Sequence, residues 1–353
     1  MARITSLRMS NLAPIRTSTP TSGSSITPTS AQTEAHRWTT LQQPLHHLGV
    51  MTSIRTASNS LERTNARREM TRHRHTLEGS TVHPPMRFAV LGAGSFGTAI
   101  GVHLGNLGLD VKLWRRSSTS DLNAIINESD VLILGVPAQE MRNFLSQIDT
   151  DKPVVSLAKG IEASNLKRMS QVVSATLGPN PYAVLSGPSF SKDIIEGNPV
   201  GLTLASKDKN LRDSLQALLS NDLVDIKVTD DVAGVEIGGA LKNVFAIGAG
   251  ILDGVGVGDS MAGDWFTRCM VEMREVGQIL GGRWETFGGR SGLGDLVITC
   301  TDHSRNFRFG KAFAKHGSIE VALSEVGSTV EGVATLEAIH KITQSRGMMT
   351  PII

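Results

Sequence analysis

One segment, residues 86–114, constrains the fold more than any other part of the sequence. An apolar run, Met86–Leu91, is followed at once by the glycine pattern Gly92-Ala-Gly94-Ser-Phe-Gly97; a helical pattern then leads to a second run, Asp110–Trp114. This succession of strand, turn, helix and strand is the context in which a GxGxxG pattern indicates dinucleotide binding. The segment therefore predicts an α/β sheet whose first turn holds a cofactor pyrophosphate.

The three glycines of this pattern suit different tasks. We expect Gly92 to make the tight turn, Gly94 to let the backbone approach the pyrophosphate, and Gly97 to allow close packing of helix on strand. The N-terminus of the helix then faces the negative charge. The alternative is a glycine-rich turn that binds no ligand.

The residues after the second strand bear on which dinucleotide is bound. Sites specific for NAD place an acidic residue there to bind the ribose hydroxyl, whereas this sequence has Arg115-Arg116. Arginines suit the 2′-phosphate of NADP. The sequence thus predicts NADPH or NADH as cofactor, with NADPH accepted; alternatively, both arginines simply lie on a solvated surface.

More apolar runs of strand length follow along the chain. They are Asp130–Pro137, Lys152–Ala158, Tyr182–Ser186, Val200–Ala205 and Val224–Val228. Lys159 and the turn Gly187-Pro-Ser189 come directly after two of these runs, which places them at the ligand-binding edge of a parallel sheet. Beyond Asp230 the pattern is helical. We therefore predict a Rossmann-type domain over 86–229 and an all-α substrate and dimerisation domain over 230–353.

The first expected helix of the second domain, 232–251, is apolar and rich in glycine, with Asp230 or Asp231 as its cap. Each glycine inside a helix costs about 1 kcal/mol. Their accumulation beside Lys242-Asn243 indicates backbone held close to another group. That group is either a ligand or a neighbouring helix packed through small residues.

Residues 1–85 differ in composition from the rest of the chain. They contain ten arginines, four glutamates and no lysine or aspartate, a net of +6, which leaves −4 of the total +2 for residues 86–353. An acid-poor leader rich in arginine and hydroxyl residues is typical of an organellar transit peptide, here plastid in preference to mitochondrion. The alternatives are a merely disordered extension or an over-extended gene model, and in the latter case the expected location is cytoplasmic.

Composition also excludes several classes of function. The acidic body argues against nucleic-acid binding. No apolar run has the ~18 residues that a membrane span needs. The two cysteines, Cys269 and Cys300, are too few for a disulfide framework. We predict no metal site.

Seven motifs in order give the chain a family resemblance. They are Gly92–Gly97, Lys159-Gly160, Ser186–Ser189, Gly238–Val244, Gly292-Leu-Gly-Asp295-Leu, Thr299-Cys-Thr301 and Ser304-Arg305-Asn306. Together they resemble the bacterial-type, cyanobacterial or plastid-like NAD(P)-dependent glycerol-3-phosphate dehydrogenases over residues 86–353. The resemblance implies a 6-phosphogluconate-dehydrogenase-like fold and often a homodimer.

The resemblance also implies a reaction and a set of site residues. The family reduces dihydroxyacetone phosphate reversibly to sn-glycerol 3-phosphate, here for glycerolipid synthesis, with Lys242 resembling the proton donor and acceptor. Lys159 and Asp295 resemble its catalytic partners. The residues that resemble substrate contacts are Lys159, Gly187, Ser189, Lys242, Asp295, Thr299, Ser304, Arg305 and Asn306. Those that resemble cofactor contacts are Gly92, Gly94, Ser95, Phe96, Gly97, Arg115, Arg116, Lys159, Ser191, Arg305 and Glu331.

The chemistry of these residues supports the same roles. A lysine ammonium can stabilise and protonate the oxyanion that hydride addition creates, if burial or a neighbouring cation such as Lys159 lowers its pKa. Asp295 and Thr299 are four residues apart, so a helix beginning there presents both on one face. Asp295 could hold the Lys242 ammonium, or could serve as a helix N-cap. Arg305 offers a planar fork for phosphate oxygens.

The sequence departs from the family pattern in four places. The linker between the second strand and Asp130 is some thirty residues shorter than in many members, the stretch Gly258–Trp265 differs, and the loop 301–304 is about one residue shorter. The chain ends at Ile353, from which we expect a truncated helical domain.

Two other functions stay open. The protein could be a catalytically impaired NAD(P)-binding paralogue, or another 3-hydroxyacid-type dehydrogenase of this architecture.

Overall fold

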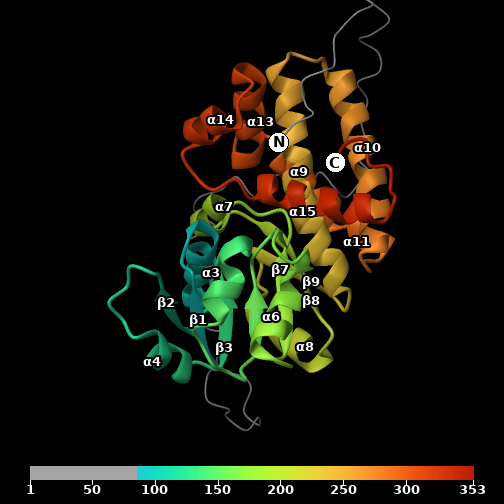
Figure 1. The fold of residues 1–353 in the computed structure, drawn as a ribbon. Coiled ribbons are helices and arrows are strands. Elements are labelled where there is room, and N and C mark those ends of the chain that lie inside the picture. Colours follow the sequence, from blue (N-terminus) through green and yellow to red (C-terminus); the bar gives the residue numbers. More distant parts are fainter. Residues whose placement is uncertain (1–85) are drawn as a thin grey trace, which may run out of the picture. The chain divides into compact units, whose positions relative to one another are not determined.

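The computed structural model describes residues 86–353 (Figure 1). The predicted transit peptide, 1–85, lies outside the described residues. A seven-stranded sheet, in the order β2-β1-β3-β4-β7-β8-β9, forms the first half of the described chain. Its strands are β1 Arg87–Leu91, β2 Asp110–Trp114, β3 Val131–Leu134, β4 Val154–Ser156, β7 Tyr182–Ser186, β8 Val200–Ser206 and β9 Val224–Thr229.

The first five strands in this order pair in parallel. Four of them, β1, β3, β4 and β7, are almost wholly buried, as apolar strands covered on both faces must be, whereas the edge strand β2 is partly exposed. One face carries α3 Ser95–Asn106, α7 Ser191–Glu196 and α8 Lys209–Leu219, and packs around Phe88 and Val90. The other carries α4 Leu122–Asn127, α5 Met141–Leu145 and α6 Met169–Leu177, and packs around Leu91 and Leu132.

The far edge of the sheet departs from a purely parallel order. β8 pairs antiparallel with β7 and parallel with β9. The sequence predicted these strands but not their direction, because a strand buried on both faces has the same apolar pattern in either orientation. The short hairpin of β5 Ile161–Glu162 and β6 Lys167–Arg168 was not predicted at all.

The second half is helical, as the sequence predicted. Its helices are α9 Val232–Gly254, α10 Asp259–Ile279, α11 Trp284–Phe287, a π-helical turn Arg290–Gly294, α12 Asp295–Thr299, α13 Arg305–His316, α14 Ile319–Val326 and α15 Glu331–Ser345. Asp231, rather than Asp230, caps α9 through its side chain, which accepts from the Gly234 N–H at 2.9 Å. In Figure 1, α15 crosses α9 on the side of the helices nearest the sheet.

Helix α9 is the central element of this half. Within residues 86–353, only α9 is long and apolar enough to cross a membrane, but 78% of that stretch is buried inside the protein. It packs against α10, α12, α13 and α15 and also touches β7 and β8. α9 therefore carries its side chains to the edge of the sheet where the predicted site lies.

Candidate active site

The glycine-rich turn forms an open cradle at the end of β1. Gly92 has φ +93°, and a Cβ there would lie 2.8 Å from the backbone of Gly135 and Val136. A Cβ on Gly97 would lie 2.6 Å from the Gly92 oxygen, whereas Gly94 has no atom within 4 Å of that position. Two glycines thus serve close packing and the third leaves free space at the N-terminus of α3. This geometry fits a dinucleotide pyrophosphate.

A cavity lies beside this cradle. It brings together four of the predicted cofactor residues, Gly94, Ser95, Arg115 and Ser191. Its other lining residues are Ala93, Thr98 and Ile195. The backbone N–H groups of Gly92 and Ala93 donate to the Trp114 oxygen at 3.0 and 3.1 Å, which fixes the end of β2 against the glycine turn.

The two neighbouring arginines have different partners. Arg115 Nη2 donates to Thr98 Oγ1 at 3.3 Å and lines the cavity. Arg116 Nη2 lies 3.4 Å from Glu140 Oε2, and its side chain is 81% exposed. The sequence did not predict either contact, because both Thr98 and Glu140 come from other elements.

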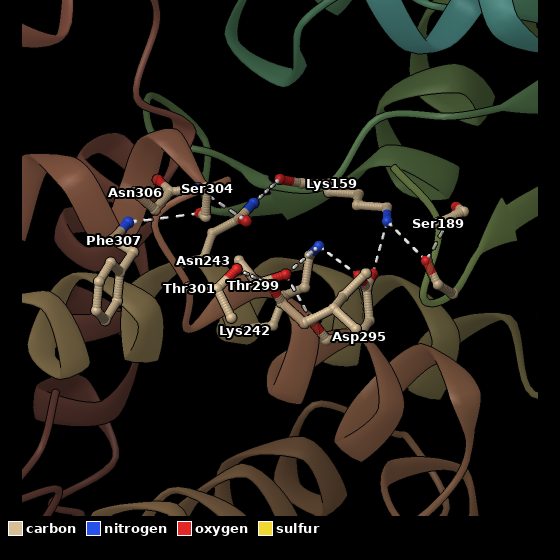
Figure 2. A network of polar contacts seen from close by, with 12 residues as sticks. Lys159, Ser189, Lys242, Asn243, Asp295, Thr299, Thr301, Ser304, Asn306 and Phe307 are labelled. Atoms are coloured by element: carbon tan, nitrogen blue, oxygen red, sulfur yellow. Dashed lines mark hydrogen bonds and ion pairs between the residues drawn. The ribbon is translucent and has the colours of Figure 1, made fainter. Parts of the chain in front are cut away.

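Two lysines share one buried carboxylate on the helical side of the site (Figure 2). Lys242 Nζ on α9 donates to Asp295 Oδ1, and Lys159 Nζ after β4 donates to Asp295 Oδ2, each at 2.6 Å. The Asp295 side chain is 1% exposed, that of Lys242 9% and that of Lys159 14%. The three groups carry a net charge of +1 in a desolvated place, which favours an anionic ligand.

Thr299 completes the surroundings of Lys242. Its hydroxyl accepts from Lys242 Nζ at 2.8 Å and donates to the Asp295 carbonyl oxygen at 2.5 Å. Asp295 and Thr299 lie on one face of α12, as their spacing predicted. The alternative role of Asp295 as an N-cap is wrong: Gly294 occupies that position and no side chain caps the helix.

Burial changes the acid strength of Lys242. Burial is the main reason why the pKa of Lys242 is lowered to about 8, and the nearby positive charge of Lys159 acts in the same direction. The Asp295 carboxylate opposes both by stabilising the ammonium. A lysine with a pKa near 8 can both donate and accept a proton close to neutral pH.

Lys159 is held at several points. Its Nζ donates to the Gly187 oxygen at 3.3 Å and lies 5.5 Å from the centre of the Phe96 ring. Its carbonyl oxygen accepts from Asn243 Nδ2 at 3.2 Å. Lys159 thereby connects Phe96 beside the glycine turn with Asn243 on α9.

An amide network continues from this point into the helical half. Asn306 Nδ2 donates to Asn243 Oδ1 at 3.0 Å, and Asn306 Oδ1 accepts from the Gly332 N–H, also at 3.0 Å. The network ties α9, α13 and the start of α15 to Lys159. The sequence places Asn243 beside Lys242 but indicates no role for it, because its contact with Lys159 joins residues that are 84 positions apart.

The remaining predicted residues lie around this centre. Ser304 caps α13, its hydroxyl accepting from the Phe307 N–H at 3.4 Å. Arg305, the first residue of α13, is exposed. Burial raises the pKa of Glu331 at the start of α15, while Arg305, the Ala138 backbone and both site lysines oppose that rise. Ser189 donates to the Gly187 oxygen at 3.2 Å.

Within residues 86–353, no group of three or more His, Cys, Asp and Glu side chains gathers as a metal site would require. The polar groups of the described site are the two lysines, the carboxylates of Asp295 and Glu331, the guanidinium of Arg305, hydroxyls and amides. Together with the glycine cradle, they define a nicotinamide-dependent oxidoreductase with a Rossmann-type sheet and a helical second half.

Comparison with known proteins identifies the family. The profile of the NAD-dependent glycerol-3-phosphate dehydrogenase C-terminus matches residues 231–353, and that of the N-terminus matches 117–212. A Clostridium perfringens protein named glycerol-3-phosphate dehydrogenase, NAD(P)+, is 36% identical over 298 residues, covering 75% of this chain and 90% of the relative. A Thermoanaerobacter protein of the same name is 37% identical over 76% of this chain and 90% of the relative.

Solved structures agree with this result. The crystal structure of glycerol-3-phosphate dehydrogenase from Coxiella burnetii superposes with a TM-score of 0.72 at 30% identity, covering 76% of this chain and 92% of that one. A Plasmodium falciparum glycerol-3-phosphate dehydrogenase shares the fold, with a TM-score of 0.68 at 22% identity and coverage of 75% and 87%. The chain belongs to the NAD-dependent glycerol-3-phosphate dehydrogenase family.

Proposed function

We propose that this protein catalyses the reversible, NAD(P)H-dependent reduction of dihydroxyacetone phosphate to sn-glycerol 3-phosphate. The observation that carries the proposal is the buried pair of lysines, Lys159 and Lys242, on the single carboxylate of Asp295. The names of the relatives support the same activity.

The glycine cradle suits the pyrophosphate of the cofactor, with Gly92, Gly94 and Gly97 shaping it. Ser95, Arg115 and Ser191 line the cavity beside it, and Phe96, whose ring centre lies 5.5 Å from Lys159 Nζ, is a further proposed cofactor contact. Arg116, Lys159, Arg305 and Glu331 are the remaining proposed cofactor contacts. When bound, the nicotinamide supplies or accepts the hydride at the substrate carbon.

Lys242 is proposed to move the proton in this reaction. In the reducing direction its ammonium stabilises the developing oxyanion and transfers a proton to it. Asp295 and Thr299 fix the position of Nζ, because both accept hydrogen bonds from it. In the oxidising direction the neutral amine accepts the proton from the substrate hydroxyl.

The phosphate of the substrate requires positive charge and donors. Lys159 and Arg305 supply the charge, and Asn306, Ser304, Ser189 and the Gly187 turn supply the polar surroundings. A 3-hydroxyacid substrate without phosphate would not need this much positive charge. An impaired paralogue would be expected to have lost part of the lysine–aspartate cluster, which is complete here.

The test is oxidation of NADPH and of NADH by the full-length chain in the presence of dihydroxyacetone phosphate. We expect turnover that falls by about 10²- to 10⁴-fold in Lys242→Ala. The matched control is Lys341→Ala, an exposed lysine on α15 paired with Glu337, which should leave the rate unchanged. A folded protein that binds cofactor but turns over no dihydroxyacetone phosphate would instead support the impaired paralogue.

We further propose that the protein acts as a homodimer that supplies glycerolipid synthesis in a plastid. Exposed apolar side chains, Val255, Val257 and Met261, lie where α9 turns into α10 and support an interface there. Light scattering of the purified chain tests the dimer. A fluorescent fusion to residues 1–85 tests the location, and cytoplasmic fluorescence would overturn the plastid assignment.

A further inference from the structure

A carboxylate reaches the end of β2 from a different element. NAD-specific sites of this fold place an acidic residue directly after this strand. Here Arg115 and Arg116 follow the strand, but Glu140 of the short helix η2 Ala138–Glu140 lies 3.4 Å from Arg116. The pair thus combines the cation that suits NADP with the carboxylate that suits NAD.

Two sets of contacts fix this arrangement. The side chain of Gln139, next to Glu140, donates to the Ile161 oxygen at 2.7 Å and accepts from the Ala163 N–H at 3.0 Å. Trp114, next to Arg115, packs against Phe144 on α5 with ring centres 5.7 Å apart. Gln139 thus fixes η2 against β5, and Trp114 fixes the end of β2 against α5, which directly follows η2 in the chain, although Arg116 and Glu140 are themselves exposed.

We propose that Glu140 is a specificity-determining residue that restrains the preference for NADPH and keeps NADH acceptable. The inference rests on the proposed cofactor site. When the cofactor has no 2′-phosphate, Arg116 keeps its pairing with Glu140, and the carboxylate is available to a ribose hydroxyl. A 2′-phosphate competes with Glu140 for Arg116 and is repelled by the carboxylate.

Arg115 differs from Arg116 in this respect. Among the described residues its side chain has no acidic partner and bonds only to the Thr98 hydroxyl, so nothing charged competes for it. Arg115 is therefore expected to contribute to both cofactors, whereas Arg116 discriminates between them. The discrimination should be modest, because an exposed ion pair is screened by water and salt.

The experiment measures the dissociation constants of NADPH and NADH for the full-length chain by nicotinamide fluorescence, without substrate. In Glu140→Gln we expect the ratio of the two constants to shift about two- to fivefold toward NADPH at low salt. The shift should shrink at high ionic strength and be absent when Arg116→Ala is also present. The control is Glu128→Gln, which removes the same charge from an exposed carboxylate that pairs with Lys112 of β2 and not with Arg116.

An unchanged ratio in Glu140→Gln, an equal shift in Glu128→Gln, or equal weakening of both cofactors would each overturn the inference. A wild-type chain that binds both cofactors but shows no turnover of dihydroxyacetone phosphate would overturn the proposed reaction alone. A wild-type chain that binds neither cofactor would overturn both.

Discussion

The ammonium of Lys242 and the carboxylate of Asp295 lie 2.6 Å apart, although 53 residues separate them in the chain. The long helix α9 supplies the lysine and the short helix α12 supplies the aspartate. Because Asp295 also binds Lys159, the carboxylate cannot neutralise both lysines. The excess positive charge is what the substrate phosphate and the developing oxyanion would compensate.

The pH dependence of the reaction should reflect Lys242. With its pKa lowered to about 8 by burial, Lys242 is an ammonium below that pH and an amine above it. We expect the rate of dihydroxyacetone phosphate reduction to fall as the pH rises through about 8. The rate of glycerol 3-phosphate oxidation should rise over the same interval. Initial rates of reduction and of oxidation, measured between pH 6 and 10, test this pH dependence.

If the reduction and oxidation rates changed in the same direction as the pH rises, the result would contradict this role for Lys242. The variant Lys242→Arg serves as a control, because a guanidinium stays protonated throughout this range. Residual activity in that variant should lack the pH transition near 8.

Asp295→Asn should reduce activity and shift the pH profile. The amide no longer stabilises the Lys242 ammonium, so the pKa of Lys242 should fall further and the reducing activity should be lost at a lower pH. Removing one partner from a buried ion pair costs about 3–5 kcal/mol of unfolding free energy. That loss should be smaller at pH 9 than at pH 6, since Lys242 can lose its proton.

Denaturant unfolding and rate profiles at both pH values test the Asp295 prediction. The exposed pair Arg268–Asp264 provides a matched control on α10. Asp264→Asn should change stability by less than about 1 kcal/mol and leave the profile unaltered. A profile of Asp295→Asn that coincides with wild type would mean that the carboxylate does not act on Lys242.

How much of this site the sequence could predict depends on distance along the chain. The glycine turn and the Asp295–Thr299 pair were predictable, because each depends on spacing within one element. The sharing of Asp295 by two lysines was not, because Lys159, Lys242 and Asp295 come from three separate elements. The sequence places Lys159 at the ligand-binding edge of the sheet, and it gives Lys242 a place in the same site through the family resemblance.

The fold shows the same limit. Apolar runs predicted the strands, and the helical pattern predicted α9 with Asp230 or Asp231 as its cap; the structure selects Asp231. The antiparallel direction of β8 and the contact between Arg116 and Glu140 follow from how distant segments pack. Neither feature has a local pattern in the sequence from which it could be predicted.

Glu236 is expected to be a major contributor to stability. This buried carboxylate on α9 accepts hydrogen bonds from Arg168 at 2.6 Å, from the Ser170 N–H and hydroxyl at 2.6 and 2.8 Å, and from the Tyr182 hydroxyl at 2.7 Å. Glu236→Ala would remove the acceptor of all four bonds, after which Arg168 would keep its hydrogen bond to Ser170 Oγ at 2.9 Å. We expect the free energy of unfolding to fall by about 3–5 kcal/mol.

Urea denaturation measures the effect of Glu236→Ala. The comparison is Glu337→Ala, which removes an exposed carboxylate paired with Lys341 within α15 and should cost no more than about 0.5 kcal/mol. Equal losses in the two variants would show that the network around Glu236 contributes little.

Two helical glycines, Gly250 on α9 and Gly105 on α3, yield predictions of opposite sign. A Cβ on Gly250 would lie 2.0 Å from the Phe307 oxygen and 3.1 Å from the Gly310 Cα, so Gly250→Ala must push α9 and α13 apart. Overpacking of this kind costs about 1–3 kcal/mol. Because α13 begins with Arg305 and Asn306, activity should fall together with stability.

Gly105 near the end of α3 has no atom within 4 Å of its Cβ position. Gly105→Ala should therefore raise stability by about 0.5–1 kcal/mol. Thermal unfolding of both variants tests the pair, and a stable, fully active Gly250→Ala would mean that these two helices can separate without cost to the site.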